Sequence, residues 1–230
     1  MSWRDDAANL PGLAPEEFDL NVDDTALVIV DMQYSDASRE HGWGPSLHET
    51  HPAVWSYYFD RIENTVIPQV QRLLYAFRKA HGRIVYITLG PALPDGSDLI
   101  PNRRKMGGAI GALNNHVGTP EHRILAELEP EVGELVINKT SRGAFNSSAI
   151  DQVLRNFGTK AIVVVGVSTS SCVETTARDA ADRGYNTVLV EDGTAELDEP
   201  SHEATLRQFA VRWGRVWTTN ETLDHLGLAE

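Results

Sequence analysis

The sequence predicts an α/β fold, a three-layer α/β/α arrangement around a Rossmann-like, six-stranded and mostly parallel sheet. Six short segments rich in β-branched and apolar residues recur along the chain, and segments of helical character lie between most of them. Strands that alternate with helices form parallel sheets covered on both faces. The chain has 230 residues, and we expect residues 1–230 to form a single domain.

The elements follow from these patterns in chain order. The expected strands are TALVIV (25–30), RIVYIT (83–88), ELVIN (134–138), AIVVVG (161–166), NTVLV (186–190) and RVWTT (215–219). The expected helices cover about 61–80, 121–128, 146–157, 172–183, 202–212 and 220–226. Pro68 predicts that the first helix begins near it or is kinked there.

Two connections are longer than an ordinary loop between a strand and a helix. Residues 31–60 follow the first strand and residues 89–120 follow the second. In open parallel sheets the loops at the carboxyl ends of strands form the ligand crevice. We therefore expect these two segments to act as lids over a site.

Composition narrows the classes of partner. The chain carries 33 acidic and 20 basic residues and a formal net charge of -13, which disfavours nucleic acid and anionic membranes as partners. The first residues lack the layout of a secretory signal, and no apolar run approaches the roughly 18 residues of a membrane span. We expect a cytoplasmic protein that acts on a small molecule.

The chain has a single cysteine, Cys172, within VGVSTSSCVETTARDAA (165–181). A lone cysteine forms no internal disulfide, so its place in the sequence needs another explanation. The segment reads as a strand, a tight turn and the start of a helix. Because a helix N-terminus and a nearby ammonium group favour a thiolate, we expect the ionised sulfur to be stabilised there.

Three polar residues end three of the expected strands: Asp31, Lys139 and Cys172. If the first and fourth strands are neighbours where the strand order reverses, Asp31 and Cys172 face each other and Lys139 leans in. This set suits nucleophilic acyl transfer, with Asp31 as general base and acid, Lys139 as electrostatic support and Cys172 as nucleophile. Backbone N–H groups at the helix start would stabilise the oxyanion.

Three segments give the chain a family resemblance: ALVIVDMQ (26–33), VINKTSRGAFNSS (136–148) and GVSTSSCVETTARDAADRGYNTVLVEDGTAE (166–196). With them the chain resembles the isochorismatase-like superfamily of cysteine hydrolases. The resemblance implies an Asp31–Lys139–Cys172 triad on a sheet of order 3-2-1-4-5-6. It also implies a cis peptide between Val167 and Ser168, an oxyanion hole formed by the N–H groups of Ser168 and Cys172, and a homodimer or homotetramer.

Departures from the family pattern bear on the substrate. Asp36 stands where many relatives have an aromatic residue. The motif TSSC (169–172) is similar to the TSGC of N-carbamoylsarcosine amidases, whereas RGAFNSS (142–148) and CVETTARDAADRGY (172–185) resemble members that act on biuret and other ureides. We expect a carbamoyl or ureido compound such as biuret, triuret or N-carbamoylsarcosine.

The resemblance also bears on metals. Nicotinamidases of this superfamily bind zinc through an Asp and two His, usually with a D-x-H pattern after the second strand. The corresponding segment GPALPDGSDLIPNRRK (90–105) has no histidine, so we expect no metal and no other cofactor. His41, His48 and His51 lack the spacing of a zinc site and are expected to be surface or lid residues.

Six further residues are candidates for substrate binding, and each has a structural alternative. Arg103 and Arg104, in a basic run with Lys105, suit a substrate carboxylate or carbonyl, or the run is a solvated loop. Phe145 and Asn146 are candidates to line the pocket, with simple core packing as the alternative for Phe145, and Gln33 and Tyr34, which follow Asp31, are candidates for substrate contact with a role away from the substrate as the alternative.

Three rival functions stay open. A vinyl-ether hydrolase of the isochorismatase type is one, but the resemblance implies that those members generally lack the cysteine. A non-catalytic binding module is the second. A redox-sensing thiol protein is the third, although the chain offers no second cysteine as a resolving partner.

Overall fold

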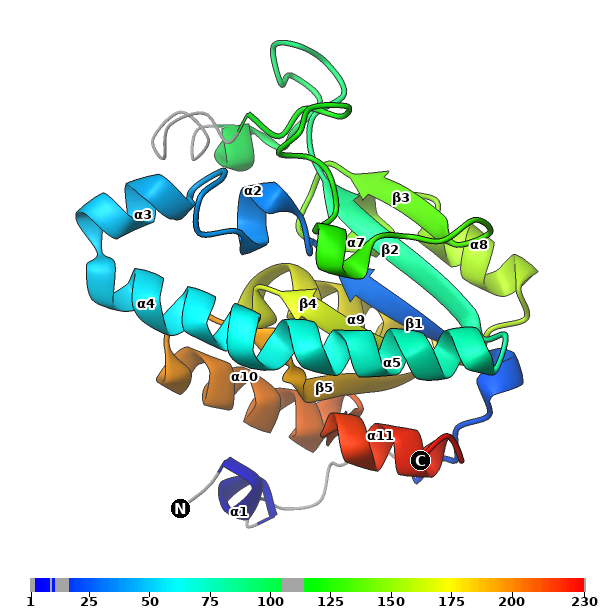
Figure 1. Cartoon of the computed structure of the whole chain (residues 1–230). Helices are drawn as coiled ribbons and strands as arrows, with labels where there is room; N and C mark the ends of the chain where they lie inside the picture. Colours follow the sequence, from blue (N-terminus) through cyan, green and yellow to red (C-terminus); the bar gives the residue numbers. More distant parts are fainter. Residues whose placement is uncertain (1–2, 9, 11–16, 105–113, 230) are drawn as a thin grey trace.

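The computed structural model describes residues 3–8, 10, 17–104 and 114–229. It contains a six-stranded sheet whose neighbouring strands all pair in parallel, in the order β3-β2-β1-β4-β5-β6 (Figure 1). The predicted fold class and strand order are therefore confirmed. The strands are β1 (Thr25–Val30), β2 (Arg83–Leu89), β3 (Leu135–Lys139), β4 (Ala161–Val167), β5 (Asn186–Ala195) and β6 (Arg215–Trp217).

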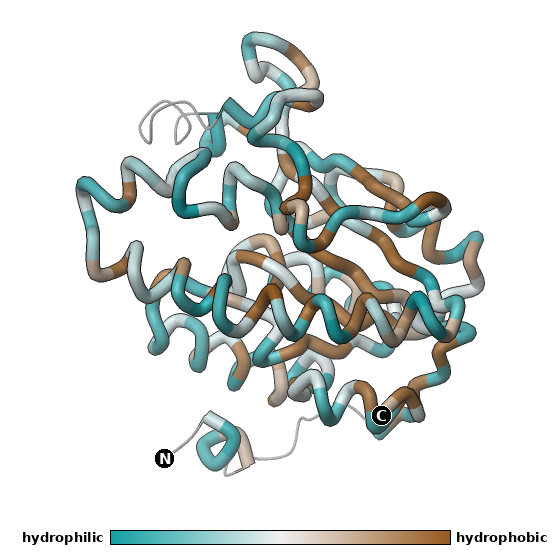
Figure 2. Tube along the Cα trace, in the orientation of Figure 1, coloured by the Kyte–Doolittle hydropathy of each residue, from teal (hydrophilic) through white to brown (hydrophobic). Residues whose placement is uncertain are grey.

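The central strands β1 and β4 are buried along their whole length, because helices cover both faces of the sheet. Successive side chains of a strand point to opposite faces. In β1, Leu27 and Ile29 join one hydrophobic cluster, and Val28 and Val30 join the other. Figure 2 shows this apolar character as brown strands in the middle of the molecule.

One face of the sheet is covered by a long helical rod and by α11 (Thr219–His225) (Figure 1). The rod consists of α4 (Pro52–Arg61), a π-helical turn (Ile62–Val66) and α5 (Ile67–Lys79). Pro68 lies in the first turn of α5, directly after the π-helical turn, so the hydrogen-bonding pattern of the rod changes where the proline lacks a backbone N–H. The helix predicted over 61–80 is thus confirmed, and it has an additional N-terminal extension.

The opposite face is covered by three helices, which pack against the second hydrophobic cluster. They are α8 (Ile150–Asn156), α9 (Glu174–Asp182) and α10 (Glu199–Arg212). The N-terminal helix α1 (Trp3–Ala8) adds Trp3 to this side. The predicted helix 146–157 is divided into α7 (Ala144–Ser147) and α8.

The helix predicted over 121–128 is wrong. Only Ala126–Leu128 forms a 3-10 turn, and Gln33 and Ile124 form an antiparallel bridge. The Tyr34 N–H donates to the Arg123 carbonyl over 3.0 Å. Tertiary pairing with the segment after β1 therefore outweighs the helical propensity of these residues.

The first long connection is largely helical. Residues 31–60 contain α2 (Tyr34–Ala37), α3 (Gly44–Thr50) and α4. Aromatic side chains pack these helices together, and the ring centroids of Trp43 and Tyr58 are 5.3 Å apart. A short 3-10 helix (Val22–Asp24) also precedes β1.

None of the helices in the described part of the chain has the length and apolar character that a bilayer crossing requires.

Candidate active site

The carboxyl edge of the sheet brings Asp31, Lys139 and Cys172 to one place. Asp31 directly follows β1, Lys139 is the last residue of β3, and Cys172 lies in the turn after β4. The Lys139 Nζ donates to Asp31 Oδ2 over 2.8 Å, and both side chains are buried. Lys139 therefore reaches across β2, which separates its strand from β1.

Asp31 has an unusual backbone and an incompletely bonded side chain. Its φ of 52° lies in the left-handed region, which Asp tolerates better than most residues, and its N–H donates to the Ile87 carbonyl over 2.9 Å. Its Oδ1 is buried and accepts no hydrogen bond from the part of the chain that the structure describes. A buried carboxylate oxygen without a partner costs free energy.

Gly166 brings the end of β4 close to β1. Its φ is +119°, and a Cβ there would lie 2.0 Å from the Val30 carbonyl oxygen. Any other residue would push the two strands apart. The close approach places the turn that follows β4 beside Asp31.

Cys172 lies within a π-helical turn (Thr169–Val173) that leads into α9, and it is only 4% exposed. Burial, followed by the Asp31 carboxylate, raises the pKa of its thiol to about 12, although Lys139 and Arg103 oppose the rise. The expectation of a stabilised thiolate is therefore wrong for the free protein. The sulfur is protonated at neutral pH, because desolvation disfavours its charged form more than the nearby cations favour it.

Lys139 keeps its charge despite complete burial. Burial lowers the pKa of its ammonium group, but opposing interactions led by the Asp31 carboxylate outweigh this effect, so the pKa is raised above its usual value. Lys139 is therefore an ammonium group that donates to Asp31. The ammonium can hold the Asp31 side chain in a fixed orientation beside the sulfur.

The turn that carries Cys172 is anchored by residues that the sequence analysis did not select. The Ser170 N–H donates to Glu196 Oε2 over 2.7 Å, and Thr169 Oγ1 lies 3.0 Å from His202 Nδ1. Glu196 directly follows β5. Its position as a polar residue at the end of a strand is the sequence feature that could have identified it as a site residue. The Val167–Ser168 peptide is cis, as the family resemblance implies.

A second charged pair, Asp36 and Arg103, lies beside the triad. The Arg103 Nη2 is 3.6 Å from Asp36 Oδ1, and Ser35 Oγ donates to Asp36 Oδ2 over 2.6 Å. Burial raises the pKa of Asp36 above its usual value, against the opposing effect of Arg103. The Tyr58 hydroxyl donates to the Asp36 carbonyl over 3.2 Å. Arg103 also interacts electrostatically with Cys172.

The other candidates for substrate binding lie in different surroundings. The Gln33 amide is buried and bonded to backbone, with Nε2 2.7 Å from the His122 carbonyl and Oε1 2.7 Å from the Leu89 nitrogen. Tyr34 packs edge-on against His41. Arg104 is exposed.

Phe145 and Asn146 lie on the α9 side of the sheet. Phe145 belongs to the same hydrophobic cluster as Cys172, and the Arg183 guanidinium carbon lies over its ring, 4.9 Å from the centroid. The Asn146 Nδ2 donates to Asp179 Oδ2 over 2.8 Å. Lys105, the last residue of the basic run, lies outside the described residues.

The three histidines of the first long connection do not converge. His48 packs on Trp55 with ring centroids 4.4 Å apart, His41 packs on Tyr34, and His51 is exposed. Across residues 3–8, 10, 17–104 and 114–229, no group of three or more His, Cys, Asp or Glu side chains is placed to hold a metal ion.

Comparison with known proteins gives the family. The model described as "Isochorismatase domain" matches residues 25–221, so the chain belongs to the isochorismatase family. A ureidoacrylate amidohydrolase of Agrobacterium fabrum is 30% identical over 220 residues, which cover 90% of this chain and 92% of the relative.

Solved structures share the fold. A cysteine hydrolase from Pseudomonas syringae pv. phaseolicola has a TM-score of 0.76 at 24% identity and covers 95% of this chain and 98% of its own. The N-carbamoylsarcosine amidase from Thermoplasma acidophilum has a TM-score of 0.64 at 22% identity and covers 85% of this chain and 96% of its own.

Proposed function

We propose that the protein is a metal-independent cysteine amidohydrolase that cleaves a C–N bond in a small amide or ureide. The observation that carries the proposal is the incompletely bonded Asp31 carboxylate, fixed by Lys139 at the same strand ends that place Cys172. The 30%-identical relative that acts on ureidoacrylate supports the reaction class.

In the first step the Cys172 sulfur attacks the carbonyl carbon of the substrate and transfers its proton to Asp31. Because the pKa of the thiol is raised to about 12, this proton leaves as the C–S bond forms, and no resting thiolate is needed. The carbonyl π electrons move to oxygen, where the N–H groups of Ser168 and Cys172 are proposed to stabilise the negative charge.

In the second step the oxyanion collapses and the C–N bond breaks. Asp31 returns its proton to the leaving nitrogen, and ammonia or an amine departs from an acyl- or carbamoyl-enzyme. A water then attacks the thioester carbon and gives a proton to Asp31. The C–S bond breaks, and the sulfur recovers its proton from Asp31.

The substrate class is proposed to be carbamoyl or ureido compounds, with biuret, triuret and N-carbamoylsarcosine as examples. Arg103 supplies N–H donors and Asp36 supplies acceptors next to the triad, and these match the carbonyl and N–H groups of a urea unit. We further propose a single domain that works as a homodimer or homotetramer and binds neither nucleic acid nor membranes.

A screen for ammonia release tests the proposal. The purified protein is incubated with small amides, carbamoyl amino acids, biuret, triuret and nicotinamide, with Cys172→Ala as the background control. Release from a carbamoyl or ureido compound by the natural chain alone is the expected result. Equal rates from the two proteins, or no release from any compound, would overturn C–N hydrolysis by this cysteine.

A further inference from the structure

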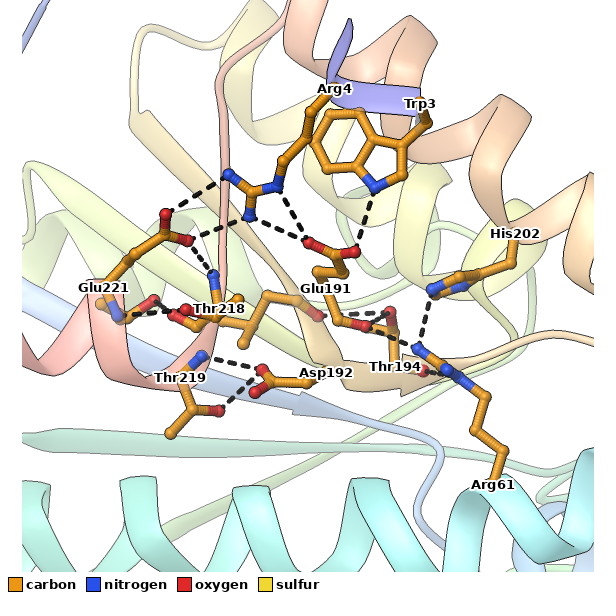
Figure 3. A network of polar contacts seen from close by, with 12 residues as sticks. Trp3, Arg4, Arg61, Glu191, Asp192, Thr194, His202, Thr218, Thr219 and Glu221 are labelled. Carbon is orange, nitrogen blue, oxygen red and sulfur yellow. Dashed lines mark hydrogen bonds and ion pairs between the residues drawn. The ribbon is translucent and has the colours of Figure 1, made fainter. Parts of the chain in front are cut away.

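A partly buried polar network reaches the turn that carries Cys172 at Thr169. Arg61, the last residue of α4, extends toward β5 and α10 (Figure 3). Its Nε donates to the Thr194 carbonyl and its Nη2 to the Glu191 carbonyl, both over 2.9 Å. The same Nη2 lies 2.8 Å from His202 Nε2.

A bulge in β5 explains why these carbonyls face Arg61. The register between β4 and β5 passes from Val164 opposite Leu189 to Gly166 opposite Thr194. Residues 190–193 of β5 therefore stand against Val165 alone. A bulge disrupts the hydrogen-bond ladder and bends the strand, which turns the Glu191 carbonyl away from β4.

The contacts fix the tautomer of His202. A guanidinium group only donates hydrogen bonds, so Nε2 accepts from Arg61 and the ring proton is on Nδ1. Burial, followed by the Arg61 charge, lowers the pKa of His202 to about 3 against a smaller opposite effect of the Glu191 carbonyl. The neutral ring therefore donates its Nδ1–H to Thr169 Oγ1 over 3.0 Å.

Thr169 is the first residue of the turn that contains Cys172, and its side chain is completely buried. The next residue, Ser170, is anchored through its N–H by Glu196. The turn is thus held by two neighbouring contacts, one to α10 and one to the residue after β5. A displacement of about 1 Å at a reacting group can lower the rate by about 100-fold.

We propose that His202 and Thr169 are positioning residues for the nucleophile turn. Arg61 orients the ring of His202, His202 holds Thr169, and Thr169 fixes the turn so that the Cys172 sulfur and N–H face the substrate. The inference rests on the proposed function, because it assigns the purpose of the network to the proposed nucleophile. Neither residue touches the substrate.

Thr169→Val and Thr169→Ser form the test, since valine keeps the shape of threonine and serine keeps its hydroxyl. Assays are run well below the unfolding temperature. In the valine variant kcat should fall about 10- to 100-fold while KM stays within about 3-fold, and the serine variant should stay within about 3-fold of the natural protein in both. A valine variant with normal kcat, or equal losses in the two variants, would overturn the proposal.

Alkylation by iodoacetamide gives a readout that needs no substrate. Cys172 is the only cysteine, so the modified fraction of the protein reports on that sulfur alone. We expect faster alkylation of the valine variant, because the loosened turn exposes the thiol, and an unchanged rate for the serine variant. If the natural protein hydrolyses nothing, the proposed function fails, yet this comparison still decides the positioning role.

His202→Asn and His202→Leu provide a second pair. Asparagine can place an N–H donor near the position of Nδ1, whereas leucine cannot. The asparagine variant should therefore keep at least about 5-fold more of its kcat than the leucine variant, given the cost of misplacing a reacting group. Equal kcat values would contradict the role of the His202–Thr169 hydrogen bond.

Discussion

The two ends of β3 carry two ion pairs that differ in how completely their carboxylate is hydrogen-bonded. Before the strand, Glu134 accepts from Arg78 at both oxygens, over 2.7 and 2.9 Å, and Oε2 also accepts from the Tyr86 hydroxyl and the Glu131 N–H. At the other end, Lys139 contacts Oδ2 of Asp31, and Oδ1 accepts nothing from the described residues.

This difference separates a structural ion pair from one that is available for chemistry. Burial raises the pKa of Glu134, but the hydrogen bonds from Arg78, the Glu131 N–H and Tyr86, together with the Arg78 charge, outweigh burial and the pKa is lowered. Both of its oxygens are engaged in stabilising the junction between α5 and the sheet. Asp31 has a free oxygen beside a thiol, which costs stability but allows the carboxylate to accept a proton.

Asp31→Asn disrupts the Lys139–Asp31 ion pair and should have the largest effect on turnover. The amide cannot take the thiol proton, so turnover should fall by about 10²- to 10⁴-fold, the usual contribution of a general base. The variant also leaves Lys139 buried without its counter-charge, so its unfolding midpoint must be measured to show that it is folded in the assay. Turnover within 10-fold or so of the natural protein would contradict the role of Asp31.

Arg103→Ala and Arg104→Ala sharpen the assignment of the basic run. Arg103 is largely buried beside Asp36, whereas Arg104 is exposed. Loss of a charged donor costs about 1.5–3 kcal/mol, so KM should rise by about 10- to 100-fold in the Arg103 variant and stay within about 2-fold in the Arg104 variant. Steady-state kinetics on the best substrate of the screen give both values, and equal KM values would count against Arg103 as a substrate contact.

Glu134→Gln disrupts the Arg78–Glu134 ion pair and should leave turnover nearly unchanged. The free energy of unfolding should fall by about 1–3 kcal/mol at pH 7, as measured by urea denaturation. Because the pKa of Glu134 is lower in the folded than in the unfolded protein, its contribution is present above the unfolded value near 4.5.

The same variant has a defined pH dependence. The contribution of Glu134 is lost as pH falls from the unfolded value through the lower folded pKa, so the natural protein and the variant should converge in stability on the acid side. A difference in stability that stays constant from pH 7 into acid would show that the carboxylate charge is not the stabilising feature.

The sheet could be predicted from the sequence because β1 and β4 are buried on both faces, which requires continuous β-branched runs. β1 matches TALVIV residue for residue. β5 extends five residues beyond the predicted run NTVLV (186–190). The added residues, EDGTA (191–195), have no strand pattern of their own and join the strand through the bulge. The sequence could not exclude a helix over 121–128, because the structure that forms there instead depends on the pairing of Ile124 with Gln33, which is distant in the chain.

The convergence of Asp31, Lys139 and Cys172 could also be predicted, because the strand order that the family resemblance implies makes the first and fourth strands neighbours, and Lys139 is long enough to reach across β2. The protonation of Cys172 could not, since it depends on how much of the sulfur is buried and on the balance between Asp31 and two cations. His202 was missed because its neutral tautomer is set by Arg61, which is 141 residues away in the chain.

Alkylation of the natural protein tests the central claim most directly, since the chain has one cysteine. The protein is treated with increasing amounts of iodoacetamide at alkaline pH, and the modified fraction is measured by mass spectrometry alongside ammonia release. The account predicts that turnover falls in proportion to the modified fraction and that the substrate protects the sulfur. A fully alkylated protein that still releases ammonia at the original rate would contradict it.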